Sequence, residues 1–104
     1  MDKKRPIHPG IVLLKNFMEL NNISQNALAK AVGAAPRRIN EIVNQRRSIT
    51  PDSALRLAKF FDTTPEFWIE MQAKYDLEVA REKIQDKIDK EVKTLKYFRD
   101  KENG

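Results

Sequence analysis

The stretch from Ser24 to Ile49 constrains this chain most: SQNALAKAVGAAPRRINEIVNQRRSI. Ser24 is a good helix N-cap, because its hydroxyl can accept a hydrogen bond from an unpaired N–H of the first turn. Gly33 can end that helix, since glycine adopts positive φ without a steric penalty. Pro36 suits the first position of a second helix, where its missing N–H costs nothing. We therefore expect two short helices joined by a tight turn, over residues 25–32 and 36–44.

The apolar residues of this stretch indicate how the two helices pack. Ala29 must be small if the helices cross closely. Ile39 and Ile42 recur at helical spacing and can pack back onto Leu28 and Val32. Because each position has its own steric reason, the pattern is typical of a helix-turn-helix, a motif that lays its second helix in the major groove of DNA.

The exposed side of the second helix carries groups that can read bases. Arginine can donate two hydrogen bonds to guanine, and asparagine pairs in a similar way with adenine. The alternative is that these polar groups only solvate a surface helix. The candidate residues on this face are Pro36, Arg37, Asn40, Glu41 and Asn44, with Arg38 on its flank.

Positive charge is concentrated in the same stretch. The formal net charge is +5, and residues 24–49 hold five basic residues against the single acid Glu41, which is +4 of that total. Arg46 and Arg47 form a basic loop directly after the second helix, so we expect them near a DNA backbone. An ordinary solvated loop is the alternative for this pair. A cationic membrane-surface helix is disfavoured, because a turn interrupts the basic residues.

Composition disfavours several other functions. The 104 residues include no cysteine, one histidine and three glycines. We therefore expect no disulfide, no metal site, no glycine-rich phosphate loop and no cofactor. His8 is expected to cap or pack rather than catalyse, no catalytic residue is assigned, and we expect that the chain is not an enzyme. Neither a signal peptide nor an apolar run of about 20 residues is predicted, so a cytoplasmic location is expected.

Three further helices are predicted around the motif. One covers residues 11–20, after a turn at His8-Pro9-Gly10. Thr50-Pro51 and Thr64-Pro65 each combine a cap with proline at the first helical position, and so begin two more. In the first of these helices the residues predicted to face inward are Val12, Leu13, Phe17 and Leu20, and those predicted at the margins are Ile11, Leu14 and Met18.

The helix that begins after Thr64 is rich in aromatic residues, most of which we expect in the core. Part of it is also expected to form a partner interface, because helix-turn-helix proteins commonly bind two half-sites as two-fold dimers. The residues assigned to a dimer interface are Phe67, Trp68, Met71 and Tyr75.

The end of the chain differs in composition. Residues 81–104 hold eight basic and six acidic residues. One thin apolar stripe survives there at helical spacing, and it predicts either a continuation of the preceding helix or a sixth helix. The stripe consists of Ile84, Ile88, Val92 and Leu95. The predicted fold is all-α: a lambda-repressor-like five-helix bundle containing the helix-turn-helix, with an extended or additional C-terminal helix. The predicted domains are a flexible N-terminal arm (1–6), the helix-turn-helix domain (7–80) and a charged amphipathic helical extension (81–104).

Three stretches of the sequence resemble one family, the HigA or VapI-type antitoxins of the Xre/Cro-like helix-turn-helix proteins. They are RPIHPG (5–10), ISQNALAKAVGAAPRRINEIVNQRRSITPDSALRLAKFF (23–61) and TPEFWIEMQAKYDL (64–77). PRRINEIVN and TPEFW together make the resemblance specific. Two residues depart from the family pattern: Ile11 stands where an acid commonly follows HPG, and Gln45 where a glycine commonly follows the second motif helix.

The resemblance implies a five-helix fold, a homodimer and repression of the protein's own operon through a palindromic operator. It also implies neutralisation of a RelE-like ribonuclease toxin, HigB. By position, it adds Gln25 and Asn26 as phosphate contacts beside the base-reading set. Two alternatives stay open: a stand-alone Xre-family repressor without a toxin partner, and a protein-interaction module that no longer touches DNA.

Overall fold

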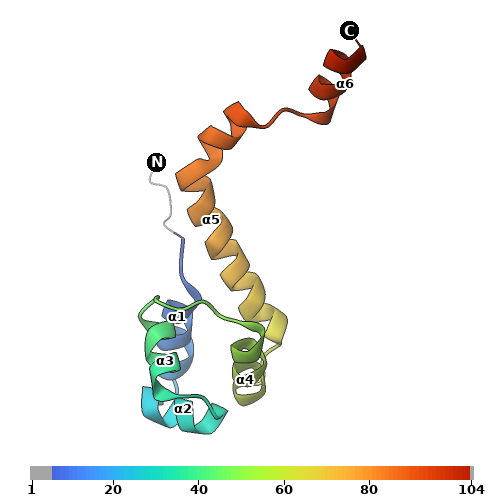
Figure 1. Ribbon diagram of the computed structural model, residues 1–104. Helices are drawn as coiled ribbons and strands as arrows, with labels where there is room; N and C mark the ends of the chain where they lie inside the picture. Colours follow the sequence, from blue (N-terminus) through green and yellow to red (C-terminus); the bar gives the residue numbers. More distant parts are fainter. Residues whose placement is uncertain (1–5, 104) are drawn as a thin grey trace.

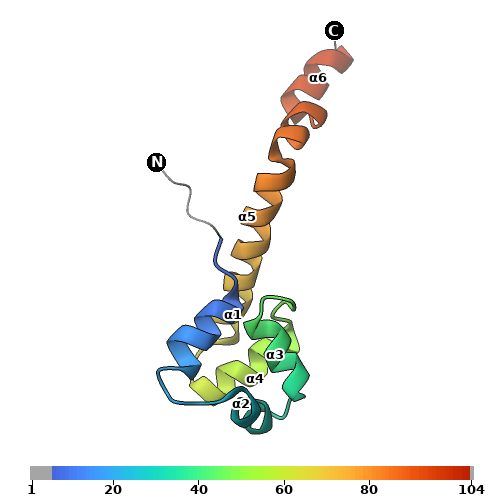
Figure 2. The same ribbon diagram turned by 90° about the vertical axis from the view of Figure 1, so that its left-hand side faces the viewer.

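A body of packed helices carries a long arm in the computed structural model, which describes residues 6–103 (Figure 1). The molecule measures 65 × 31 × 22 Å, and the arm accounts for its length (Figure 2). The elements in chain order are α1 (Pro9–Val12), η1 (Leu13–Met18), α2 (Gln25–Val32), α3 (Pro36–Val43), α4 (Pro51–Phe61), α5 (Pro65–Glu91) and α6 (Leu95–Asn103). All are helical, and α1 with η1 forms one continuous first helix, so the predicted all-α fold is confirmed.

The first helix begins at Pro9 rather than at Ile11. His8 is its N-cap, and the Nδ1 atom of His8 accepts a 2.9 Å hydrogen bond from the backbone N–H of Gly10. The buried imidazole also meets the ring of Tyr75 edge-on, with centroids 4.9 Å apart. The prediction that His8 caps or packs is therefore confirmed.

The second half of the first helix, η1, is a π-helix. The backbone N–H of Glu19 donates to the carbonyl of Leu14, five residues earlier, over 2.9 Å. A five-residue spacing places Leu13 and Met18 on the same face, and both are fully buried. The predicted α-helical period was wrong here: Leu20 is 76% exposed instead of inward, and Met18 lies in the core instead of at the margin.

Gly10 lies where the first helix meets α3. A Cβ atom at this position would lie 1.8 Å from the carbonyl oxygen of Ile42, so no side chain fits. The absence of a side chain at Gly10 therefore sets how closely the first helix can approach α3.

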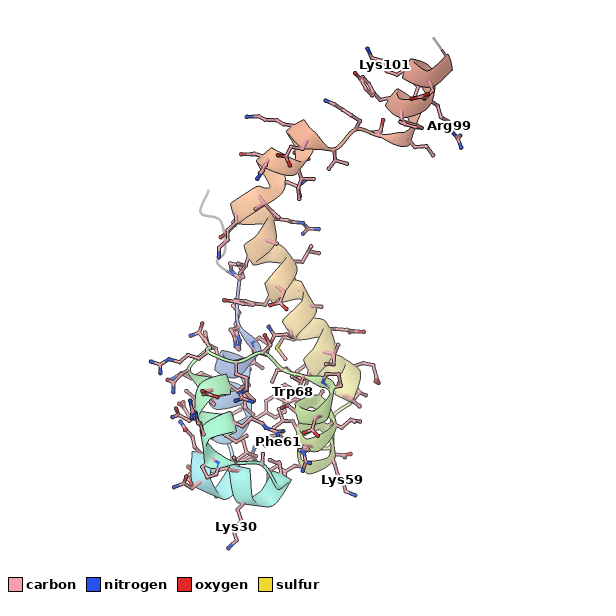
Figure 3. All side chains as sticks on the ribbon, in the orientation of Figure 1. Lys30, Lys59, Phe61, Trp68, Arg99 and Lys101 are labelled. Carbon is pink, nitrogen blue, oxygen red and sulfur yellow. The ribbon has the colours of Figure 1, made fainter. Side chains whose placement is uncertain are left out.

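The core lies between the helix-turn-helix and the first turns of α5. The indole of Trp68 is fully buried, and its Nε1 donates to the hydroxyl of Thr63 over 2.9 Å. The ring of Phe17 packs against it at 5.0 Å. Figure 3 shows Phe61 and Trp68 pointing into the interior of the body. The buried apolar residues are Leu13, Met18, Leu28, Ala29, Val32, Ile39, Ile42, Val43, Ile49, Ala54, Leu57, Ala58 and Trp68.

The arm consists of the second half of α5 and of α6 (Figure 1). Every side chain from Arg81 to Glu102 is exposed. The apolar stripe is interrupted, because Val92 adopts an extended backbone that ends α5, and Leu95 begins α6. The helix therefore continues past residue 80, and a sixth helix follows it.

Nothing in the helices between residues 6 and 103 combines the length and the apolar character that a membrane crossing requires. In the same range, no cluster of His, Cys, Asp or Glu could hold a metal ion. The predicted arm 1–6 lies outside the described residues, apart from Pro6, which is half-buried.

Candidate nucleic-acid interface

Local sequence signals set the limits of the two helices of the motif. The hydroxyl of Ser24 accepts a 3.1 Å hydrogen bond from the N–H of Ala27 at the start of α2. Gly33 ends α2 with φ of 69°, and Pro36 begins α3. Ala29 is fully buried where α2 packs on α3. The predicted start, turn and packing of this motif are confirmed.

The outer face of α3 is open to solvent. The side chain of Arg37 is 85% exposed, and Pro36, Asn40 and Asn44 are exposed beside it. Arg38 and Glu41 are half-buried at the edges of the same face. The structure therefore brings the predicted base-reading set together on one helix surface.

A hydrogen bond joins this surface to the start of α2. The Nδ2 atom of Asn40 donates to Oε1 of Gln25 over 3.1 Å. Asn44 donates in turn to the carbonyl of Asn40 over 2.9 Å. Gln25, assigned on the family resemblance, thus lies against the base-reading set, and Asn26 is exposed next to it.

Glu41 connects the helix to the loop that follows it. One carboxylate oxygen accepts two hydrogen bonds from Arg47, at 2.9 Å from Nε and 2.7 Å from Nη2. The other oxygen accepts from Nε of Arg37 at 3.3 Å. The two hydrogen bonds from Arg47, and then the one from Arg37, lower the pKa of Glu41, so this carboxyl stays ionised at neutral pH.

A second ion-pair group holds Arg38. Its Nη1 lies 2.6 Å from Oδ1 of Asp52 on α4, and Nε of Arg56 lies 2.7 Å from the same oxygen. Arg56 also donates from Nη1 to the carbonyls of Val32 and Gly33, at 2.9 and 3.3 Å, at the end of α2. Bonds from Arg56 and then Arg38 lower the pKa of Asp52. Arg38 is thereby tied to the scaffold that holds α2, α3 and α4 together.

Sequence reasoning missed Asp52 and Arg56 as part of this arrangement. Their spacing of four residues in α4 is a signal for a helical ion pair. The further pairing with Arg38, fourteen residues from Asp52, depends on the tertiary fold.

The loop after α3 turns sharply. Gln45 has φ of 62°, in the left-handed region that favours glycine. The N–H of Arg46 then donates to the carbonyl of Glu41 over 2.8 Å. The side chain of Arg46 is exposed and forms no ion pair within residues 6–103.

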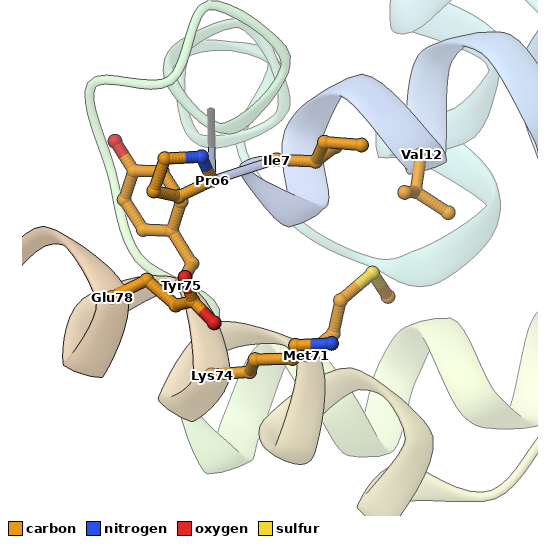
Figure 4. A pocket seen from close by; sticks show the side chains of 7 residues that line it. All are labelled: Pro6, Ile7, Val12, Met71, Lys74, Tyr75 and Glu78. Atoms are coloured by element: carbon orange, nitrogen blue, oxygen red, sulfur yellow. The ribbon is translucent and has the colours of Figure 1, made fainter. Parts of the chain in front are cut away.

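The residues expected at a dimer interface do not share one environment. Trp68 has no exposed surface within its own chain, so its assignment to an interface is wrong. Phe67 is 39% exposed, and Met71 and Tyr75 are half-buried. Met71 and Tyr75 line a cavity of about 410 Å³ between α5 and the segment that leads into the first helix (Figure 4).

Comparison with known proteins identifies the class of this chain as helix-turn-helix proteins. The helix-turn-helix family model matches residues 14–68. Virulence-associated protein I of Dichelobacter nodosus is 45% identical over 76 residues, which are 73% of this chain and 70% of that protein.

Similar solved structures identify a narrower branch within the helix-turn-helix proteins. The structure of a HigA-family addiction module antidote protein from Coxiella burnetii is 49% identical, with a TM-score of 0.84 over 88% of this chain and 99% of that one. The structure of the Pseudomonas aeruginosa antitoxin HigA with the higBA promoter is 38% identical, with a TM-score of 0.85 over 88% and 99%. The chain belongs to the HigA and VapI-type antitoxins of the helix-turn-helix family, as its sequence predicted.

Proposed function

We propose that this chain is the antitoxin of a type II HigBA-like toxin–antitoxin module. It binds its own operator as a dimer, represses transcription and neutralises a RelE-like ribonuclease toxin. The observation that carries the DNA-binding part is the open face of α3, where the 85% exposed side chain of Arg37 lies beside Asn40 and Asn44. The solved relative with the higBA promoter supports the same assignment.

The exposed polar groups divide into two sets. Arg37, Asn40 and Asn44 read base edges in the major groove, since arginine suits guanine and asparagine suits adenine. Phosphate contacts surround them and fix the register of the helix on the duplex. The contacts assigned to the backbone are those of Gln25, Asn26, Arg46 and Arg47. Pro36, Arg38 and Glu41 complete the interface, and Arg38 orders it through Asp52.

A homodimer presents two such α3 helices to the two halves of a palindromic operator. We assign its interface to α5, where Phe67, Met71 and Tyr75 leave apolar surface in the single chain. Trp68 supports this surface from beneath.

A gel-shift assay on two duplexes tests the DNA-binding part. One duplex, called the upstream duplex, comes from the promoter region upstream of the operon that contains this chain, and the other is its shuffled sequence. Arg37→Ala should weaken binding to the upstream duplex by about 1–3 kcal/mol and should affect the shuffled duplex much less. Lys59→Ala removes an exposed cation on α4 and serves as the control, with an equal and small effect on both. If Arg37→Ala lowers the affinity for both duplexes equally, Arg37 does not read bases.

The toxin part is tested in cells. The neighbouring reading frame is expressed with and without this chain, and growth is scored. Growth arrest that this chain relieves supports the antitoxin reading. A neighbour that is harmless when expressed alone favours the alternative, a stand-alone Xre-family repressor.

A further inference from the structure

Glu41 is the one acid in the basic stretch 24–49, and it lies half-buried at the edge of the proposed DNA-reading surface. The side chain of Glu41 is only 23% exposed, whereas the side chains of Arg37 and Arg47 that bind it are 85% and 45% exposed. The acid therefore lies beneath the two cations, which cover it from the side of the helix and from the side of the loop.

The geometry restrains each arginine differently. Arg37 gives only its Nε–H to Glu41, at 3.3 Å, which leaves both terminal nitrogens of its guanidinium for an acceptor outside the protein. Arg47 gives both Nε and Nη2 to the same carboxylate oxygen, at 2.9 and 2.7 Å. Glu41 thus directs Arg37 outward and holds Arg47 back against α3.

Stability does not explain this arrangement. Ion pairs this exposed to solvent contribute little to folding, because water screens them. Their effect on DNA binding is larger. Each cation that reaches a phosphate releases counterions and raises affinity for any sequence, whereas a fixed carboxylate repels phosphates. An arginine that is already oriented toward a guanine edge binds that edge more tightly, because less side-chain freedom is lost on binding.

We infer that Glu41 is a positioning residue that sets the specificity of the reading surface. It orients Arg37 for a base edge and restricts Arg47 to the backbone phosphates of a duplex that is in register. Its negative charge repels a duplex that binds in any other register. This inference rests on the proposed function, because it requires that α3 reads DNA.

Glu41→Gln tests the inference, since glutamine keeps the size of the side chain and removes its charge. Binding to the upstream duplex and to its shuffled sequence is measured by fluorescence anisotropy over a range of salt concentrations. With about one more cation free to reach phosphate, the affinity for shuffled DNA should rise about eightfold at roughly 0.1 M salt, and the slope of log K against log salt should steepen by about one. The affinity for the upstream duplex should rise less, so the ratio between the two duplexes falls.

The matched control is Glu70→Gln, which removes the same charge from an exposed position on α5. It should change both affinities slightly and alike. If Glu41→Gln leaves the ratio of the affinities for the two duplexes at its wild-type value, the inference is overturned, because the change in overall charge would then explain any gain in affinity. A large drop in its melting temperature would also overturn the inference, since Glu41 would then be structural.

A second measurement isolates the action on Arg37. In an Arg37→Ala background, Glu41→Gln should lower the ratio of the affinities for the two duplexes less, because the oriented side chain is gone and only the action on Arg47 remains. A ratio that falls as much as before would show that Glu41 does not act through Arg37. If the wild-type chain already binds both duplexes equally, the proposed function fails and the inference fails with it; discrimination by wild type together with an unchanged Glu41→Gln ratio refutes the inference alone.

Discussion

The two halves of α5 have different surroundings although they form one helix. The first half carries Trp68 and Gln72, both buried, and the amide oxygen of Gln72 accepts a 2.8 Å hydrogen bond from the N–H of Ile49. Beyond Arg81 every side chain of the helix is exposed. Regular helical geometry therefore says little about how strongly a segment is held. Packing of an apolar face supplies most of the stability of a helix, and only the first half has it.

The sharpest test of this contrast compares two residues of α5. Trp68→Ala should lower the free energy of unfolding by about 4 kcal/mol, because it opens a cavity in the core. Ile88→Ala in the arm should lower it by less than about 0.5 kcal/mol. Urea denaturation followed by circular dichroism measures both. A loss of about 2 kcal/mol at Ile88 would mean that the arm is packed in solution, and the contrast would disappear.

The body should also be intolerant of added volume. Gly10→Ala should cost about 3 kcal/mol, because the new Cβ would lie 1.8 Å from the carbonyl oxygen of Ile42 and the helices would have to separate. Asn16→Ala, at an exposed position of η1, is the control and should have little effect. If Gly10→Ala melts like wild type, the first helix can move away from α3 at little cost.

How much of this arrangement the sequence predicts depends on the range of the interaction. Caps act within a turn, so Ser24, Gly33 and Pro36 predicted the limits of α2 and the start of α3. Leu20 and Met18 were misplaced, because the prediction assumed 3.6 residues per turn where η1 has a wider period. Gly10 approaches Ile42 only because the first helix packs on α3, and no local sequence pattern predicts that contact.

The candidate site divides in the same way. The shared exposed face of Arg37, Asn40 and Asn44 follows from helical spacing alone. That Arg38 binds Asp52, and that Arg47 folds back onto Glu41, follows from where α4 and the loop lie. Sequence therefore predicts which groups a helix presents, and tertiary structure decides which of them are restrained.

Lowering the pH should reduce the stability of the helical body, because His8 is buried there. Burial lowers the pKa of His8 below its usual 6.5, although nearby Asp76 opposes this. The unfolded chain then binds a proton more readily than the folded one, so the stability from His8 is present above about pH 6.5 and is lost as the pH falls through the lowered pKa. The loss cannot exceed about 1.4 kcal/mol per pH unit. Denaturation curves between about pH 7.5 and 5.5 measure this loss.

His8→Asn provides the comparison for that experiment. Asparagine keeps an acceptor at the N-cap and does not titrate in this range. The variant should show a flatter dependence of stability on pH than wild type. An identical dependence in both proteins would assign the effect to other groups.

The smallest expected effect is a gain. Gln45→Gly should raise the free energy of unfolding by about 1 kcal/mol, because glycine adopts the positive φ of 62° without strain. Ser48→Gly in the same loop lacks that conformation and should give no gain. A loss of stability at Gln45→Gly would mean that the turn is not strained.

Between its two core residues the π-helix η1 contains one residue more than an α-helix would need to place both on the same face. Leu13 and Met18 are five positions apart and both buried, while Lys15 and Asn16 between them face solvent. A chain shortened by one of these two residues would bring the same leucine and methionine to a four-residue interval, at which an α-helix also aligns them. The body thus accommodates the equivalent of a one-residue insertion by widening a single turn, and the register of everything downstream is unchanged.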